Sequence, residues 1–202
     1  MTVPMAITMG DASGVGPEIV LRRAAEGVLD DVVVYGDATI LRHGAQLLGI
    51  DPAVVDRLEL VDLARLTAAD HRPGQLDAVA GAAAKAYVEA ATADALAGRV
   101  AGVVTMPMNK EATQLGDPRF VGHTELIAEL CAAPDVTMML TDGDLAVTHV
   151  STHCSLREAI ERVRPERVRA VIDLTHAALG RFLERPRLAV CGLNPHAGEH
   201  GL

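Results

Sequence analysis

The chain lacks the residues that most nucleic-acid-binding proteins use. Its 202 residues include no Trp, two Phe and two Tyr, and 27 acidic against 18 basic side chains give a formal net charge of −9. Unpaired bases are usually held by stacking on aromatic rings, and the phosphate backbone attracts basic rather than acidic surfaces. The composition therefore argues against a nucleic acid as partner.

Cysteines and long apolar runs are also scarce. The three cysteines, Cys131, Cys154 and Cys191, form an odd set without CxxC spacing, which is typical of reduced thiols in a cytoplasm rather than of a disulfide framework. There is no run of roughly 18 apolar residues, as a membrane span requires, and no basic segment leading into an apolar signal sequence. We therefore expect a cytoplasmic protein with no membrane partner.

Short apolar segments, by contrast, are abundant, since 50% of the residues are hydrophobic. In the first half of the chain they alternate with segments of helical character. The predicted strands are residues 5–9, 32–37, 57–61 and 100–107, and the predicted helices are residues 19–25, 38–48 and 75–97. This alternation is typical of βαβ units with a parallel sheet. His43 and His71 are isolated in this region and are expected to be surface residues rather than ligands.

The second half of the chain has a different predicted order. Two strands form a hairpin around a tight turn, and further helices and a last strand follow. The strands are residues 137–141, 145–150 and 187–193, and the helices are residues 126–132, 155–164 and 165–183. We expect an α/β protein with a first lobe over residues 1–118 and a second α/β lobe over residues 119–202.

The stretch from Ala146 to Ile160 is the most informative single segment. Its first half is apolar and β-branched, and its second half begins a helix with a capping box, in which Ser155 is followed three residues later by Glu158. His153 is therefore predicted to lie in a strand-to-helix turn. Ligands of open α/β sheets bind beyond the carboxyl ends of the strands, where such a turn lies.

A second histidine, His196, directly follows the predicted last strand, so we consider His153 and His196 candidate metal ligands at one sheet edge. A catalytic zinc site normally has three protein ligands. The candidates for a third ligand are His149, Cys154 and His200. The β-branched neighbours of His149 favour a strand, which weakens its pairing with His153, and a free cysteine is more often a small buried hydrophobe.

Polar turns follow other predicted strands. The glycine-rich segment 10–18 is either an anion-binding loop or an ordinary tight turn before a helix. Lys110 is either a helix-start charge or an electrophilic or proton-relaying group. His123 and Thr124 form either a clamp for a hydroxyl or phosphate group or an ordinary N-cap.

Five segments, taken in order, resemble the motifs of the 4-hydroxythreonine-4-phosphate dehydrogenase family of vitamin B6 biosynthesis. They are Gly10-Asp11-x-Ser13-Gly14-Val15-Gly16-Pro17-Glu18, Pro107-x-Asn109-Lys110-Glu111, Gly122-His123-Thr124-Glu125, Ser151-Thr152-His153-x-x-Leu156-Arg157-Glu158 and Leu193-Asn194-Pro195-His196-Ala197-Gly198-Glu199. The resemblance covers essentially the whole chain. It implies a two-lobed α/β/α fold with mostly parallel sheets, related to isocitrate and isopropylmalate dehydrogenases, and a homodimer that uses NAD and a divalent metal such as Zn, Mg or Co.

The resemblance also implies roles for individual residues. His153 and His196 match metal ligands of the family, His123 and Thr124 match its substrate-binding pair, and Lys110 matches a catalytic position. The implied reaction is oxidation and decarboxylation of 4-phosphooxy-L-threonine to 3-amino-2-oxopropyl phosphate in pyridoxal phosphate biosynthesis. Relatives of the same fold oxidise 4-phosphorylated threonate or erythronate, or cyclic cis-diols, and these remain alternatives.

The chain departs from the family in two places. Ala12 stands where the family usually has proline, and members of the family continue far beyond the segment that contains His196. The third metal histidine of the family lies in that continuation. We therefore expect a C-terminally truncated second lobe that alone binds metal weakly and has little activity. The rival interpretation is an inactive or regulatory fragment that binds metal and phosphate.

Overall fold

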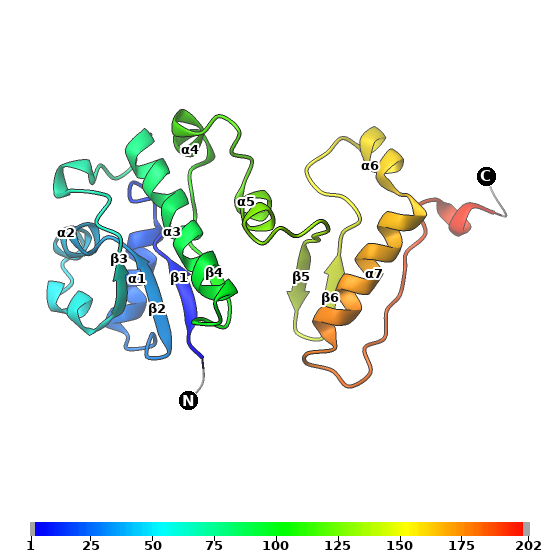
Figure 1. Ribbon diagram of the computed structural model, residues 1–202, viewed down its shortest axis with the longest axis horizontal. Coiled ribbons are helices and arrows are strands. Elements are labelled where there is room, and N and C mark those ends of the chain that lie inside the picture. Colours follow the sequence, from blue (N-terminus) through cyan, green and yellow to red (C-terminus); the bar gives the residue numbers. More distant parts are fainter. Residues whose placement is uncertain (1–2, 200–202) are drawn as a thin grey trace. The chain divides into compact units, whose positions relative to one another are not determined.

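The computed structural model describes residues 3–199, and the chain divides between Ala132 and Ala133 into two compact units. Unit 1 contains the residues before this point and unit 2 those after it. A four-stranded sheet forms the centre of unit 1 (Figure 1), with the order β3-β2-β1-β4 and every neighbouring pair parallel. Its strands are β1 (Met5–Thr8), β2 (Val32–Gly36), β3 (Glu59–Asp62) and β4 (Val103–Thr105).

Helices cover both faces of this sheet. The three longest are α1 (Gly16–Ala25), α2 (Ala38–Leu48) and α3 (Ala78–Leu96). α1 and α2 pack against each other, whereas α3 packs against β1, β2 and β4. The chain runs from β1 through β2 to β3 in one direction and then returns past β1 to reach β4. Because such crossovers are right-handed, the returning helix α3 lies on the opposite face from α1 and α2.

Local sequence explains where these helices begin and end. The side chain of Asp77 accepts hydrogen bonds from the backbone N–H groups of Val79 and Ala80, which otherwise have no partner within α3. α2 ends at Gly49, whose φ of 66° lies in the left-handed region that glycine adopts without strain. Two 3-10 helices, η1 (Pro52–Arg57) and η2 (Ala68–Asp70), lie in the connections around β3.

Two short helices, α4 (Lys110–Gly116) and α5 (His123–Leu130), follow β4 and pack against α3. The approach of α4 to α3 depends on Gly81, because a Cβ atom there would lie 2.4 Å from the carbonyl carbon of Ala112. Asn109 begins α4 by accepting a hydrogen bond from the N–H of Ala112. Phe120 and Leu126 are buried against Val88 of α3.

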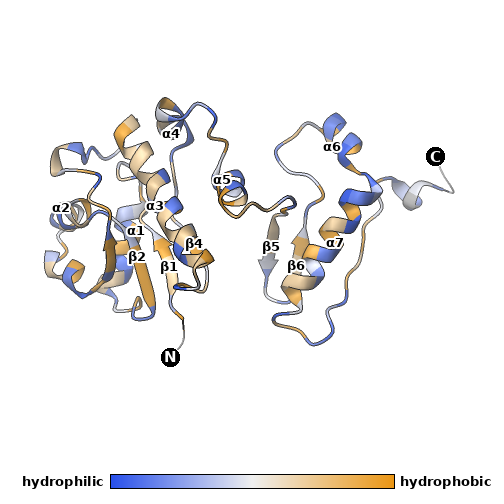
Figure 2. Ribbon diagram, viewed as in Figure 1, coloured by the Kyte–Doolittle hydropathy of each residue, from blue (hydrophilic) through white to orange (hydrophobic). Residues whose placement is uncertain are grey.

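The core of unit 1 lies between the sheet and its helices. Figure 2 shows hydrophobic residues concentrated in β1, β2 and α3. The largest fully buried side chains of unit 1 include Met9, Leu21, Tyr35, Ile40, Leu41 and Tyr87. The buried hydroxyl of Tyr87 donates a short hydrogen bond to the carboxylate of Asp37, which also accepts from the N–H of Arg65. The main core of unit 1 therefore contains a buried polar pair whose two side chains are hydrogen-bonded to each other.

Unit 2 contains an antiparallel hairpin, two helices and an extended tail. The elements are β5 (Met139–Asp142), β6 (Leu145–Thr148), α6 (Leu156–Arg162), α7 (Pro165–Leu179) and the 3-10 helix η3 (Pro195–Gly198). Polar contacts tie α7 to β6 and to the segment after it, since the hydroxyls of Thr175 and Thr148 are hydrogen-bonded at 2.9 Å and Arg167 donates to the carbonyl of Val150 at 3.0 Å.

The fold confirms the predicted α/β class with a parallel sheet and the predicted hairpin. The predicted strand at residues 187–193 is wrong, because among residues 3–199 this segment has no hydrogen-bonded neighbour to form a ladder. The division after Ala132 keeps α5 with unit 1, because α5 packs against α3, and the domain boundary after Pro118 stays a prediction. None of the helices within the described part of the chain is long and apolar enough to cross a bilayer.

Candidate functional site

The carboxyl ends of β1 and β4 form the topological switch point of unit 1. The connection after β1 leads to one side of the sheet, whereas β4 lies on the other side of β1. Loops that leave neighbouring strands in opposite directions leave a crevice between them, where α/β proteins bind ligands. The first two sequence motifs, the glycine-rich segment and the segment that contains Lys110, follow β1 and β4 and so meet at this edge.

Backbone contacts hold these two motifs together. The N–H of Asp11 donates to the carbonyl of Pro107 at 3.0 Å, and the Asp11 carboxylate accepts the N–H of Ser13 at 2.8 Å. Gly10 has a φ of 74°, and a Cβ atom there would come within 2.6 Å of the Pro107 oxygen. The glycine is thus required both by the left-handed backbone and by the close approach of the two loops.

A pocket of about 510 Å³ opens beside this contact. It is lined by Asp11, Ser13, Gly14, Val15 and Glu111 and by residues 74–76 and 107–109. Burial raises the pKa of the Asp11 carboxyl, and hydrogen bonds from the backbone of Ser13 and Asn109 oppose that rise. The hydroxyl of Ser13 is buried and has no hydrogen-bond partner among the described residues. Two carboxyl groups, those of Asp11 and Glu111, therefore line a pocket of mixed polar and apolar character, which lies where the glycine-rich segment begins α1.

Lys110 is a sequence neighbour of this pocket's lining but is not itself one of the lining residues. It is exposed at the first position of α4, between Asn109 and Glu111, which both line the pocket. The capping function at this helix start belongs to Asn109. The position of Lys110 is compatible with either interpretation of the sequence, a helix-start charge or a group that meets a ligand.

His123 comes to the same strand end from α5. It is the first residue of this helix, and its half-buried ring is hydrogen-bonded to the backbone of Met106, directly after β4. Burial lowers the pKa of the imidazole, although the bond to Met106 opposes this effect. Its Nε2 atom is buried without a hydrogen-bond partner among residues 3–199. A buried polar atom without a partner is costly, so Nε2 is a candidate for contact with a ligand.

Thr124 is the second residue of α5 and is exposed. The N-cap of this helix is Gly122, and no side chain caps it. The interpretation of Thr124 as an ordinary N-cap is therefore wrong. Its hydroxyl remains available beside His123 at the start of the helix.

His153 lies in unit 2, in the predicted turn between β6 and α6. The predicted capping box is confirmed, because Ser155 accepts from the N–H of Glu158 and the Glu158 carboxylate accepts from the N–H of Ser155. His153 is exposed and has a φ of 52°, in the left-handed region. Non-glycine residues with such backbone strain are enriched at functional sites.

His196 lies in η3 and is also exposed, with a φ of 50°. Its Nδ1 atom lies 2.5 Å from Oε1 of Glu199. A carboxylate on Nδ1 fixes the tautomer in which Nε2 carries the lone pair, which is the usual arrangement of a metal-binding histidine. The chemistry of this side chain therefore fits a divalent metal.

A complete metal site is not formed by the described residues, which contain no group of three His, Cys, Asp or Glu side chains placed to hold an ion. Of the candidate third ligands, His149 makes a 3.3 Å contact from Nδ1 to the carbonyl of Met138, Cys154 is half-buried, and His200 lies outside the described residues. Metal binding by His153 and His196 stays a prediction.

Sequence reasoning missed the contact between His43 of α2 and His71 after η2. Their Nδ1 atoms lie 3.0 Å apart, and their rings meet edge to face. The expectation that His71 is a surface residue is wrong, since it is buried. Its burial is the main cause that lowers the pKa of its imidazole, and the neighbouring His43 lowers it further. The two residues are far apart in sequence, and no local pattern indicates their contact.

Comparison with known proteins identifies the family. Residues 28–202 match the family model described as pyridoxal phosphate biosynthetic protein PdxA. The chain belongs to this family. Curated relatives include the D-threonate 4-phosphate dehydrogenases of Bordetella bronchiseptica, 40% identical, and Cupriavidus necator, 38% identical, each over 98% of this chain. The chain spans 61% and 64% of the lengths of these two proteins, which is less than two thirds.

Solved structures of PdxA relatives have the same fold. The 4-hydroxythreonine-4-phosphate dehydrogenase of Klebsiella pneumoniae is 38% identical, with a TM-score of 0.88 over 99% of this chain and 66% of its own. A terephthalate 1,2-cis-dihydrodiol dehydrogenase from Burkholderia xenovorans is 32% identical, with a TM-score of 0.69 over 98% of this chain and 64% of its own. The expected family is thereby confirmed, and with it the dehydrogenase fold.

Proposed function

We propose that this chain takes part in the NAD-dependent, metal-assisted oxidation of a 4-phosphorylated hydroxy acid, with D-threonate 4-phosphate as the first candidate substrate. The observation that carries the choice of substrate is the similarity over 98% of the chain to two relatives that bear this activity in their names. The unpartnered Nε2 atom of His123 beside the strand end of β4 supports a ligand contact there.

The proposed chemistry is an alcohol oxidation followed by loss of CO2. His153 and His196 would hold the divalent metal, which would supply polarisation of the hydroxyl oxygen, and NAD would supply the hydride acceptor. The secondary alcohol loses a hydride from carbon and a proton from oxygen and becomes a ketone. The resulting 3-oxo acid then loses CO2, and protonation of the remaining carbon leaves a three-carbon phosphorylated ketone. Lys110 is the proposed residue for moving a proton at this stage.

His123 and Thr124 are proposed to bind the phosphate end of the substrate. The ring is hydrogen-bonded to the backbone of Met106 and Nε2 has no partner among the described residues, so we assign Nε2 of the neutral ring as an acceptor, which meets an anion well only after protonation. Burial keeps the pKa of this ring low in the free protein. Phosphate binding at His123 is therefore expected to be coupled to proton uptake, and the exposed hydroxyl of Thr124 would donate a second hydrogen bond.

A second candidate substrate is 4-phosphooxy-L-threonine, which differs at C2 by an ammonium group in place of a hydroxyl. The acidic lining of the pocket, with Asp11 and Glu111, favours this candidate, since carboxylates attract an ammonium group. The match to a pyridoxal phosphate biosynthetic family supports it as well. A cyclic cis-diol is less well supported, because the dihydrodiol dehydrogenase has the lower TM-score of the two structures compared. The homodimer and the cytoplasmic location stay predictions.

The test is NADH formation at 340 nm with D-threonate 4-phosphate, 4-phosphooxy-L-threonine and their dephosphorylated forms, combined with calorimetric measurement of binding. We expect His123→Ala to weaken binding of the phosphorylated compounds by about tenfold or more and to leave the dephosphorylated ones nearly unchanged. Calorimetry in two buffers of different ionisation enthalpy measures the expected proton uptake. Equal losses for both classes of compound would contradict the role of His123, and absence of binding of every compound would overturn the function.

A further inference from the structure

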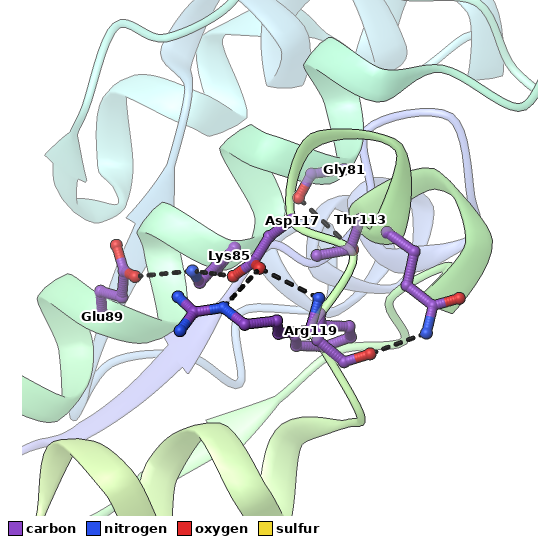
Figure 3. Close-up of polar contacts among 8 residues, drawn as sticks. Gly81, Lys85, Glu89, Thr113, Asp117 and Arg119 are labelled. Carbon is purple, nitrogen blue, oxygen red and sulfur yellow. Dashed lines mark hydrogen bonds and ion pairs between the residues drawn. The ribbon is translucent and has the colours of Figure 1, made fainter.

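The segment between α4 and α5, residues 117–122, packs on α3 through Phe120 and is also contacted by one lysine of α3, Lys85. Nζ of Lys85 lies 2.7 Å from Oδ2 of Asp117 and 3.6 Å from Oε1 of Glu89 (Figure 3). The hydrogen bond to Asp117 raises the pKa of Lys85, and the pKa of Asp117 is lowered by the same contact. Both side chains are about three-quarters buried, so water screens this pair less than it screens the surface ion pairs of the molecule.

Asp117 in turn organises the segment that leads to His123. Its Oδ1 atom accepts the N–H of Arg119 at 3.2 Å, and its carbonyl accepts the N–H of Phe120 at 3.0 Å. Gln114 donates to the carbonyl of Phe120 at 2.8 Å. These bonds place the Phe120 ring in the small core formed with α3. The chain is thus fixed at Phe120, three residues before His123, the first residue of α5.

We propose that Lys85 is a positioning residue that acts through Asp117 to set the His123 ring, so that its Nε2 atom faces the phosphate end of the substrate. This inference rests on the proposed function for the identity of the ligand. The physical reason is that Gly122, the N-cap of α5, has no side-chain cap, so the helix start is fixed by the preceding segment. Without Lys85, Asp117 keeps its bonds to the turn but loses its tie to α3.

Arg119 provides the matched comparison. It also contacts Asp117, but its Nε atom is 3.8 Å from Oδ1 and its side chain is 93% exposed, against 26% for Lys85. An exposed, long ion pair of this kind contributes little to the position of its partner. Loss of Arg119 is therefore expected to leave His123 in place, whereas loss of Lys85 is expected to move it.

The experiment compares Lys85→Met, Lys85→Arg and Arg119→Ala by NMR of the histidine rings and by ligand binding. His123→Gln identifies the His123 signals. In Lys85→Met we expect the His123 ring signals to shift, its pKa to rise toward the value of an exposed imidazole, and affinity for D-threonate 4-phosphate to fall on the order of tenfold. Lys85→Arg should largely retain the His123 ring signals and the affinity of the unmodified chain, and Arg119→Ala should change neither of them. Thermal unfolding of each variant separates displacement of the ring from loss of the fold.

The outcomes are distinguishable. If Lys85→Met and Arg119→Ala have the same His123 signals as the unmodified chain, the positioning inference is overturned whatever the ligand. If Lys85→Met moves those signals but neither it nor His123→Ala weakens binding of the phosphorylated ligand, the positioning of His123 stands and the proposed function of His123 fails.

Discussion

Unit 1 and unit 2 differ in how much of their apolar surface they bury. Unit 1 packs four strands and five helices around a core that contains Tyr35, Leu41 and Tyr87 at 1% exposure or less. Of the described side chains in residues 133–199, only Val171 and Thr175 are buried. A two-stranded hairpin is marginally stable in water unless further strands or helices cover it. Unit 1 is thus organised as an independent domain, whereas unit 2 needs additional apolar cover.

The same contrast applies to the candidate site. In unit 1, backbone hydrogen bonds bring the glycine-rich segment, the Lys110 segment and His123 to one strand end. In unit 2, His153 and His196 are exposed. A site preorganised by a packed scaffold keeps its geometry without ligand, whereas exposed side chains on turns depend on the ligand or on neighbouring protein to order them. We therefore expect the proposed phosphate-binding part to be formed before the proposed metal-binding part.

Separation of the two units should have the largest effect on folding stability. We expect residues 1–132 alone to unfold cooperatively in urea, because they retain their whole core, and residues 133–202 alone to show no cooperative transition. Circular dichroism during urea titration measures the cooperativity of each fragment, and the dispersion of amide signals in NMR spectra shows whether each fragment is folded. A cooperative transition of residues 133–202 in isolation would break the comparison.

A matched pair of leucines should show the next largest effect. Leu41 is fully buried in unit 1, and Leu140 is 56% exposed in unit 2. Leu41→Ala is expected to lower the free energy of unfolding of unit 1 by about 2–5 kcal/mol, from lost burial and the cavity left behind. Leu140→Ala should stay within about 0.5 kcal/mol. Urea titration checks both, and comparable losses would mean that unit 2 has a core that side-chain exposure does not reveal.

The features predictable from sequence are those set by neighbouring residues. The capping box of Ser155, the helix over residues 38–48 and the alternation of strands and helices in unit 1 all depend on residues a few positions apart, and the sequence predicts all three. The boundary between the units and the contact of His43 with His71 depend on packing between distant segments. Residues 187–193 have a strand-like sequence, but a strand forms only where a neighbour supplies hydrogen bonds.

Acidification should destabilise unit 1 through His71. Its folded-state pKa is lowered, chiefly by burial, below the ordinary value of 6.5, so the unfolded chain binds the proton first. The contribution to stability is therefore fully present above pH 6.5 and is lost as the pH falls from 6.5 to the lower folded pKa. Urea titrations across this range should show the loss. His71→Gln should remove this part of the pH dependence, and His176→Gln, at an exposed position of unit 2, should retain it.

The smallest effects are expected at the helix caps, where the two units again differ. Asp77 caps the 19-residue helix α3, which packs against three strands, so Asp77→Ala should lower the stability of unit 1 by about 1 kcal/mol. Asp77→Asn keeps a capping oxygen and should recover most of that loss.

Ser155 caps the seven-residue helix α6, whose Leu156 is 85% exposed and which has no buried residue. Ser155→Ala should therefore speed amide hydrogen exchange within α6 and leave the urea transition of unit 1 unchanged. A shift of that transition by Ser155→Ala as large as the shift by Asp77→Ala would show that the two units unfold as one.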